Sequence, residues 1–362
     1  MGAYPTTPEA VSADWLSAQL GKEVTELEVK AFGEGSGIIG QVTRARFVSN
    51  GANDSVIIKF PSAAPENRGV AMHYNMYGRE VDFYRDYAAA IPIRVPRAWA
   101  VEFDPESHDF VLVLEDLQGY RLGDQVAGAT LADARSAVAA IAAMHAATWN
   151  VDLPGLVSHN NPAQAEGMIG GFGVGWPVVL EKFAAVIPKV AADKGGALPD
   201  HVVRLLAEMS SGPQVLVHAD VRLDNMFFAA DQSTTDQSTL NQSTGAKDPL
   251  ALIDWQSVCS SCGEQDLAYF LTQSLPSELL RAEGAQLIEL YHQTLCAAGV
   301  EGYTLDQCKE RYRTSALYLM CYAVVIAGTL DLGNERGQAL GAALLGRSLS
   351  ALADLDAFEL LV

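Results

Sequence analysis

The feature that most constrains this 362-residue chain is a loop motif enclosed by two apolar runs. Residues 215–228 read Val-Leu-Val-His-Ala-Asp-Val-Arg-Leu-Asp-Asn-Met-Phe-Phe, which predicts two short buried strands with Asp220 and Asn225 between them. An acidic side chain in such a loop can accept the proton of an attacking hydroxyl group. A neutral amide a few residues later can ligate Mg²⁺ without adding a second anion beside that base.

The same run has the H-x-D-x-x-x-x-N spacing of a kinase catalytic loop, with His218 at its start. A lone H-x-D is common by chance. The interpretation therefore depends on whether the other parts of a phosphotransferase occur in the chain in the right order.

Composition excludes several classes of function. The length favours two domains, and 49% hydrophobic with 19% charged residues is typical of a soluble globular protein. A net charge of −20 argues against sequence-independent nucleic-acid binding and against an anionic membrane partner. The acid excess is compatible with a cationic substrate, but it also serves solubility alone.

Two further patterns indicate a cytoplasmic protein. The N-terminus lacks the basic and apolar regions of a signal peptide, and five cysteines without a regular framework suit a reducing compartment. The longest apolar run, 316–330, is shorter than the ~18 residues of a spanning helix, which predicts a buried core helix.

Residues 33–40 are a glycine-rich stretch that follows a predicted strand over 24–32. Gly35, Gly37 and Gly40 fit G-x-G-x-x-G, but the residues that follow alternate as in a strand, whereas a dinucleotide fingerprint needs a helix there. A glycine hairpin can bring backbone N–H groups close to nucleotide phosphates, which gives Gly35, Ser36 and Gly37 as candidate contacts. An ordinary glycine-rich hairpin is the alternative.

A predicted strand over 55–60 contains Lys59 after three β-branched residues, as in the lysine strand of kinases. Such a lysine neutralises the α- and β-phosphates, and an exposed strand-end lysine is the alternative. A predicted helix over 68–87 then carries Glu80, the natural partner of Lys59, although the spacing does not exclude Asp82.

Beyond this helix, the apolar strand 110–114 ends in Glu115-Asp116-Leu117, which is typical of a hinge between lobes. Backbone groups from Glu115 to Leu117 are predicted to hydrogen-bond an adenine edge. The chain then turns helical over 130–150. A glycine-rich segment, 167–175, is expected to precede a helix that starts at Trp176.

A low-complexity segment over 231–247 repeats with a period of five, which predicts an expanded hairpin tip. Asp254 ends the next apolar run, where a kinase places a Mg²⁺-binding aspartate. Asn225 and Asp254 are separated by 29 residues, and subtracting the 14 repeat residues (231–244) leaves 15, short enough for a strand pair. The single C-x-x-C at 259–262 lacks the second pair that zinc needs.

The order of these motifs resembles that of the aminoglycoside phosphotransferase/choline kinase superfamily, and the sequence of several motifs is most similar to its ecdysteroid kinase-like branch. The resemblance spans about residues 20–355. The passages that carry it are 79–84, 113–117, 266–271 and 290–295.

The resemblance implies an α+β, bilobal, protein-kinase-like fold. A small antiparallel-sheet lobe would span residues 1–115, with a hinge over 116–119. A larger, mainly helical lobe would span 120–362 and hold the catalytic loop, the insertion and Asp254.

It also implies roles for single residues. Asp220 would be the catalytic base, Asn225 and Asp254 would ligate Mg²⁺, Lys59 would contact ATP, and Glu80 would hold Lys59.

Two further residues would support the loop: His218 would brace it and Asp266 would anchor it. Two departures from the family pattern are Ala219, where glycine is usual, and Trp255-Gln256, where protein kinases have Phe-Gly.

The implied activity is ATP- and Mg²⁺-dependent phosphorylation of a small-molecule alcohol. This acceptor is expected to be apolar or steroid-like if Tyr318, Met320 and Tyr322 line its binding site rather than the core. The alternatives are a kinase of aminoglycoside or choline type acting on a cationic substrate, and a nucleotide-binding pseudokinase scaffold.

Overall fold

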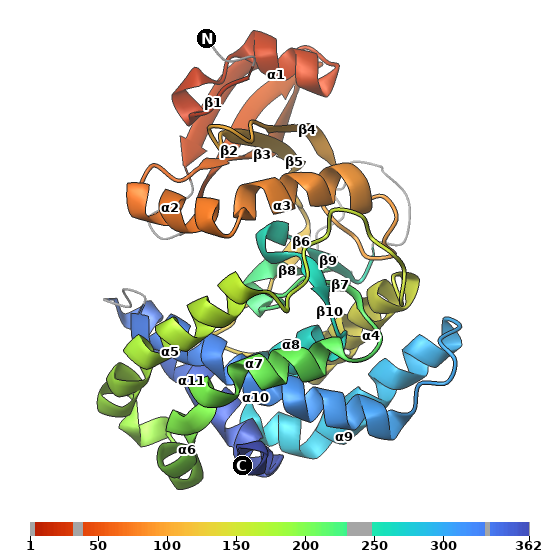
Figure 1. Cartoon of the computed structure of the whole chain (residues 1–362). Coiled ribbons are helices and arrows are strands. Elements are labelled where there is room, and N and C mark those ends of the chain that lie inside the picture. The colour runs from red at the N-terminus through yellow and green to blue at the C-terminus, as the bar shows by residue number, and fades with distance from the viewer. Residues whose placement is uncertain (1–3, 32–38, 230–247, 330–333, 362) are drawn as a thin grey trace. The chain divides into compact units, whose positions relative to one another are not determined.

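The structure is a computed structural model that describes residues 4–31, 39–229, 248–329 and 334–361. The chain divides into two compact units (Figure 1). The first comprises Met1–Ala90, Arg94–Tyr120 and Ile253–Ser257, and the second comprises Ile91–Ile93, Arg121–Leu252 and Val258–Val362. The short segment around Asp254 therefore groups with the N-terminal unit, although the residues on both sides of it in the sequence belong to the second unit.

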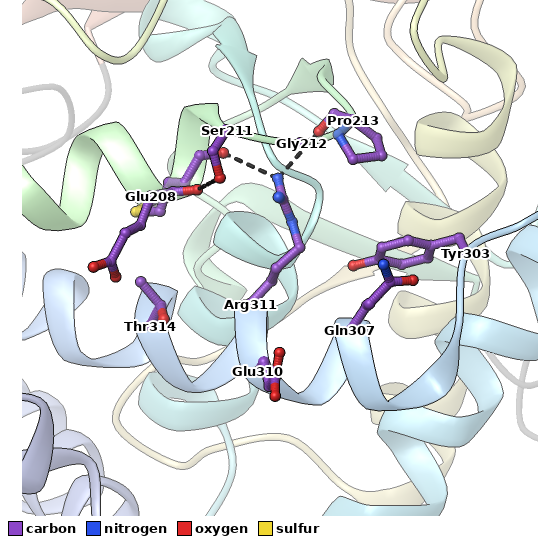
Figure 2. Close-up of a pocket in the computed structure, with 10 residues that line it drawn as sticks. Glu208, Ser211, Gly212, Pro213, Tyr303, Gln307, Glu310, Arg311 and Thr314 are labelled. Atoms are coloured by element: carbon purple, nitrogen blue, oxygen red, sulfur yellow. Dashed lines mark hydrogen bonds between the residues drawn. The ribbon is translucent and has the colours of Figure 1, made fainter.

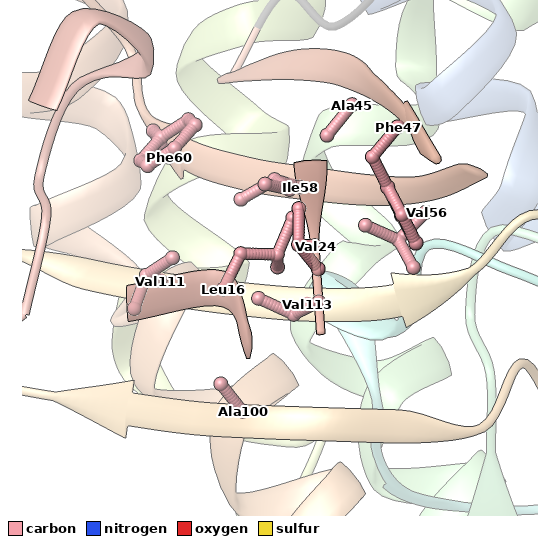
Figure 3. Close-up of a cluster of buried hydrophobic side chains, with 10 residues drawn as sticks. All are labelled: Leu16, Val24, Ala45, Phe47, Val56, Ile58, Phe60, Ala100, Val111 and Val113. Carbon is pink, nitrogen blue, oxygen red and sulfur yellow. The ribbon is translucent and has the colours of Figure 1, made fainter. Parts of the chain in front are cut away.

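The first unit is built on a five-stranded antiparallel sheet with the order β1-β2-β3-β5-β4. Alternate strand residues such as Ile58, Phe60 and Val113 pack on one face against Leu16 of helix α1 (Figure 3). The elements are α1 (Ala13–Leu20), β1 (Thr25–Ala31), β2 (Gly40–Ser49), β3 (Ala52–Pro61), β4 (Ala98–Phe103) and β5 (Phe110–Glu115).

The single helix predicted over 68–87 is instead three consecutive pieces. They are α2 (Pro65–His73), α3 (Met76–Asp82) and a π-helical turn over Phe83–Tyr87. The break lies at Asn75, whose φ of 49° is left-handed, a conformation that asparagine tolerates better than most residues. Glu80 remains on α3, so the break does not displace the predicted partner of Lys59.

The second unit is mainly helical and contains two small sheets. Its helices are α4 (Leu131–Ala147), α5 (Pro162–Lys182), α6 (Lys189–Lys194), α7 (Leu198–Ser210), α8 (Glu264–Ser274), α9 (Ser277–Ala297), α10 (Leu305–Thr329) and α11 (Glu335–Asp354). The strands are β6 (Tyr120–Leu122), β7 (Val215–Val217), β8 (Met226–Ala229), β9 (Leu250–Leu252) and β10 (Cys259–Ser261).

The glycine-rich segment 167–175 is not a loop, as the sequence suggested, but the middle of α5. A Cβ atom on Gly175 would lie 2.7 Å from the carbonyl oxygen of Val324 on α10. A Cβ atom on Gly328 would lie 2.5 Å from the Cα atom of Gly175. The glycines therefore serve the close approach of two helix backbones, a use that a local reading of glycine as a helix breaker misses.

The predicted core helix is confirmed as part of α10, in which Ala316, Leu317 and Leu319 are fully buried. Within the described residues, no helix is both long and apolar enough to cross a membrane. The predicted α+β class, an antiparallel-sheet part followed by a mainly helical part, is confirmed.

Candidate active site

Three of the predicted residues meet in the first unit at the amino group of Lys59. Its Nζ atom lies 2.6 Å from Oε2 and 2.7 Å from Oε1 of Glu80, and 2.7 Å from Oδ1 of Asp254. Lys59 projects from β3 and Glu80 from α3, and Asp254 follows β9. Residues separated by 195 positions in the sequence thus form one buried ionic cluster.

Charge pairing decides the protonation of this cluster. Burial alone would lower the pKa of Lys59, but the carboxylates of Asp254 and Glu80 raise it above its ordinary value. The amino group therefore stays charged and carries one positive charge against two negative ones. A cluster of this kind can exchange one carboxylate partner for a phosphate oxygen if a cation takes over the released carboxylate.

The segment after Asp254 is fixed to the helix of Glu80 by aromatic stacking. The ring of Trp255 lies 3.8 Å from the ring of Phe83 at an interplanar angle of 6°, and both side chains are fully buried. Asp254 itself has a φ of 68°, a strained value for a residue with a Cβ atom. Sequence reasoning missed this stack, whose only signal was a tryptophan directly after the aspartate.

At the predicted hinge, the side chain and backbone of Glu115 are already engaged. Its carboxylate pairs with Arg94, and its backbone N–H donates to the carbonyl of Arg97 at 2.8 Å. The backbone N–H of Glu115 is therefore used in pairing with the chain before β4. At the other end of the predicted hinge, the backbone carbonyl of Leu117 accepts the N–H of Tyr120 at 3.4 Å.

In the second unit, the carboxylate of Asp220 is held on both oxygens. The amide nitrogen of Asn225 donates to Oδ2 at 3.0 Å and to the backbone carbonyl of Asp220 at 2.9 Å. The hydroxyl of Tyr269 donates to Oδ1 at 3.0 Å, and Nε of Arg222 lies 3.6 Å from Oδ2. Burial and the charge of Asp220 raise the pKa of Tyr269 well above its usual range, so this phenol stays a donor.

The contact with Tyr269 was also missed from the sequence. Its signal is that Tyr269 stands three residues after Asp266 on α8, so the two side chains share one helix face. A residue that anchors the loop and one that orients its acid thus lie side by side.

Asp266 holds the backbone of the catalytic loop. Its Oδ2 accepts the N–H of His218 and its Oδ1 the N–H of Ala219, both at 2.8 Å. His145 lies 3.3 Å from Oδ2 through Nε2 and is held through Nδ1 by the hydroxyl of Tyr291 at 2.9 Å. A fully buried carboxylate thus gives partners to two N–H groups that lie beyond the end of β7.

His218 and Ala219 complete this support. Nδ1 of the buried His218 accepts the backbone N–H of Asp220 at 3.2 Å, so the imidazole links the two ends of the H-x-D tripeptide. Ala219 has a φ of 62°. This left-handed conformation costs about 1–2 kcal/mol for a residue with a Cβ atom, which explains why glycine is easier at this position.

The remaining predictions fall at or beyond the limits of the described residues. Gly35, Ser36 and Gly37, with the whole of the insertion 231–247, lie outside them. The strands that flank the insertion do pair, antiparallel, with Met226 opposite Leu252.

The oxygen donors of the predicted metal ligands fit a hard cation such as Mg²⁺. Asp254 offers a carboxylate, and Asn225 uses its amide nitrogen on Asp220, which leaves the amide oxygen for a cation. Such oxygen donors suit hard cations. Among the described residues no group of three or more His, Cys, Asp or Glu could hold a metal. Cys259 and Cys262 are buried beside His159 and Ser315.

A separate cavity of about 340 Å³ lies in the second unit between the end of α7 and the N-terminal half of α10, and none of the predicted site residues lines it (Figure 2). Arg311 reaches across it, and its Nη2 atom donates to the carbonyls of Met209 and Pro213. Its Nε atom lies 3.3 Å from the buried carboxylate of Glu264. This arginine thus links α10 to the chain that leads into β7.

Comparison with known proteins gives one family and a shared fold. The sequence model of the "Ecdysteroid kinase-like family" matches residues 35–154 and 186–299. A search of curated proteins found no match.

Two solved structures are similar over nearly their whole length. The first, a protein of Ralstonia eutropha JMP134 described as an aminoglycoside phosphotransferase, is 15% identical with a TM-score of 0.50 and covers 95% of this chain and 97% of its own. The second, a microcompartment-associated aminopropanol kinase, is 15% identical with a TM-score of 0.54 and covers 94% and 97%. These likenesses confirm the predicted kinase-like fold.

Proposed function

Since the chain belongs to the ecdysteroid kinase-like family and is thus a phosphotransferase with an alcohol group as acceptor, we propose that it transfers the γ-phosphate of ATP to a small apolar or steroid-like alcohol. The observation that carries the proposal is the meeting of Lys59, Glu80 and Asp254. An ammonium group held between two carboxylates is oriented for phosphate oxygens before any nucleotide arrives.

On this proposal, the residues of the first unit bind the nucleotide. Lys59 contacts the α- and β-phosphates and Glu80 keeps it in place. The backbone at Leu117 contacts the adenine edge. Gly35, Ser36 and Gly37 cover the phosphates through their backbone N–H groups.

Asp254 and Asn225 would hold Mg²⁺, which when bound neutralises charge on the β- and γ-phosphates. In the structure the carboxylate of Asp254 is paired with Lys59. A cation held by Asp254 would take over this carboxylate and leave the ammonium group of Lys59 to contact phosphate.

Asp220 performs the proton step. The acceptor oxygen forms a bond to the γ-phosphorus, its proton passes to the carboxylate of Asp220, and the bond from the γ-phosphorus to the bridging oxygen of ADP breaks. Asn225, Arg222 and Tyr269 all contact this carboxylate. They hold it in one orientation, so the acceptor hydroxyl meets a fixed base.

Replacing Asp220 tests the proposal. Asp220→Asn keeps the shape of the side chain but removes the base, so we expect kcat for ATP-dependent phosphorylation to fall about 10³-fold. Binding of a non-hydrolysable ATP analogue, measured by calorimetry, should be retained. The matched control is Asp224→Asn in the same loop, which should keep near-normal turnover. Ordinary turnover by Asp220→Asn would refute the proposed base.

A further inference from the structure

A row of tyrosines in the second unit begins at Asp220 and leads away from it. Tyr269 on α8 donates to Asp220. The ring of Tyr269 lies 5.9 Å from that of Tyr322 on α10, and Tyr322 lies 6.1 Å from Tyr318 one turn earlier. The transfer of phosphate uses only the first of these side chains. The other two extend from the base in a direction that an acceptor molecule can follow.

One amide fixes the hydroxyl ends of the outer tyrosines. Nε2 of Gln164, near the start of α5, donates to the hydroxyl of Tyr318 at 3.0 Å and to that of Tyr322 at 3.1 Å. His159 lies 3.0 Å from the hydroxyl of Tyr318 through Nε2. The side chain of Asn161 caps α5 by accepting the backbone N–H of Gln164, which fixes the start of the helix that carries this glutamine. Both rings are therefore set by a residue from a different helix.

The spacing between the two helices is fixed as well. A Cβ atom on Gly171 of α5 would lie 2.8 Å from a methyl group of Val325 on α10, and Gly175 meets Gly328 more closely still. Since the backbones touch there, α5 cannot approach α10 further. The distance from Gln164 to Tyr322 is thereby set.

Exposure distinguishes the members of the row. Tyr269 is 1% exposed and Tyr318 is fully buried, whereas Tyr322 is partly exposed. Val325 and Ile326, three and four residues further on the same helix face, are also partly exposed. The partly exposed surface at this point is thus one aromatic ring with aliphatic neighbours, and it is apolar apart from the tyrosine hydroxyl.

This surface suits a flat apolar molecule better than a cation. Quaternary ammonium groups are held by several aromatic faces at once, whereas of the three tyrosine rings in this row only that of Tyr322 is partly exposed. In addition, Arg222 places a positive charge 3.6 Å from the carboxylate of Asp220. A polycationic acceptor would meet this charge on its way to the base.

We propose that Tyr322, oriented by Gln164, is the residue that recognises the apolar skeleton of the acceptor, while Tyr269 positions Asp220. The inference rests on the proposed function, because it takes Asp220 as the base. It assigns Tyr322 to binding and not to chemistry. Loss of its ring should therefore raise the KM for the acceptor and leave kcat almost unchanged.

The test compares Tyr322→Ala, Tyr322→Phe and Gln164→Leu in steady-state phosphorylation. The acceptors are a polyhydroxylated steroid, 1-amino-2-propanol and kanamycin. Tyr322→Ala should raise the KM for the steroid about tenfold, because it removes an aromatic contact surface. Tyr322→Phe keeps the ring and should recover most of this loss, and Gln164→Leu should fall between the two. KM for ATP should not change in any of them.

Tyr312→Phe is the matched control, since it removes a hydroxyl from a buried tyrosine of the same helix, α10, outside the row. The inference would be overturned if Tyr322→Ala left the KM for the steroid unchanged, or if kanamycin were the preferred acceptor. As long as turnover still required Asp220, the proposed function would stand. Phosphorylation that persists in Asp220→Asn would instead overturn the proposed function. Absence of turnover with all three acceptors would overturn both.

Discussion

The side chains at Lys59 and at Asp220 are both held by several contacts, but the kinds of interaction differ. In the first unit one ammonium group is shared by two carboxylates, Glu80 and Asp254. In the second unit the carboxylate of Asp266 accepts two backbone N–H groups, and a phenol and an amide orient Asp220. The first cluster is ionic, whereas the second depends mainly on hydrogen bonds from uncharged donors.

This difference matches what each cluster has to do in phosphate transfer. Charged partners can be exchanged when other charges arrive, as ATP and a cation would bring to Lys59 and Asp254. A catalytic base must keep one orientation while its substrate comes and goes. Uncharged hydrogen-bond donors are not drawn to another partner when ions bind or leave, so they suit the second task.

The largest expected effect comes from removing the cation of the ionic cluster. Lys59→Met leaves the carboxylate of Glu80, 1% exposed, without its partner, which should lower the free energy of unfolding by about 3–5 kcal/mol. Urea denaturation measures the change. Lys22→Met, which breaks a half-buried pair with Asp54, should cost less than about 1 kcal/mol. Similar losses in the two variants would contradict the role given to burial.

The loss in Lys59→Met should depend on pH. Burial raises the pKa of Glu80 and Lys59 lowers it, so removal of the lysine leaves the raising effect unopposed. A carboxyl group whose pKa is higher in the folded than in the unfolded state binds a proton on folding. The variant should therefore recover stability relative to the wild type as the pH falls from 8 to 5, by up to about 1.4 kcal/mol per pH unit. A loss that grows on acidification would exclude this explanation.

A smaller effect is expected when the anchor of the loop is weakened. Asp266→Asn replaces one of two acceptor oxygens with an amide nitrogen, so the N–H of either His218 or Ala219 loses its partner. We expect a loss of about 2 kcal/mol in unfolding free energy. We also expect kcat to fall about tenfold, because a displaced loop misplaces Asp220.

Calorimetric unfolding and steady-state kinetics together test the Asp266 variant. Glu278→Gln, the same type of change at an exposed residue of α9, should alter neither quantity. A stability loss without any change in kcat would show that Asp266 supports the fold but does not position the base.

The residues that meet in the candidate site could be picked out from the sequence because each of them carries its signal locally. Lys59 ends a β-branched run and Asp254 an apolar one. Asp220 and Asn225 share one loop, so spacing alone suggested their roles. That Lys59 contacts Glu80 rather than Asp82 depends on which face of α3 is buried, and Asp82 is indeed the partner of Arg85.

What the sequence did not give is set by contacts between distant segments. Phe83 and Trp255 are 172 positions apart, so no local pattern links their stacked rings. The glycines of α5 look like a loop until Val324 and Gly328 lie against them. In both cases the residue type is explained by its partner and not by its own neighbours in sequence.

The smallest expected effect concerns the strained backbone of the loop. Ala219→Gly relieves a φ of 62° but also removes a buried methyl group. Ala251→Gly, in the regular strand β9, removes an equally buried methyl group with no such relief. The first variant should therefore be more stable than the second by about 1 kcal/mol, measured as the difference in urea midpoints at equal slope. Equal midpoints would mean that Ala219 is not strained.

The contact between Gly175 and Gly328 makes the spacing of the two helices depend on both glycines. With a Cβ position only 2.5 Å from the opposite backbone, neither glycine can change alone without pushing α5 and α10 apart. An alanine at either site would move Gln164 relative to Tyr322. The glycine contact thus sets the distance between the two helices. On the inference above, a substitution at either glycine would alter the choice of acceptor although no residue of the site has changed.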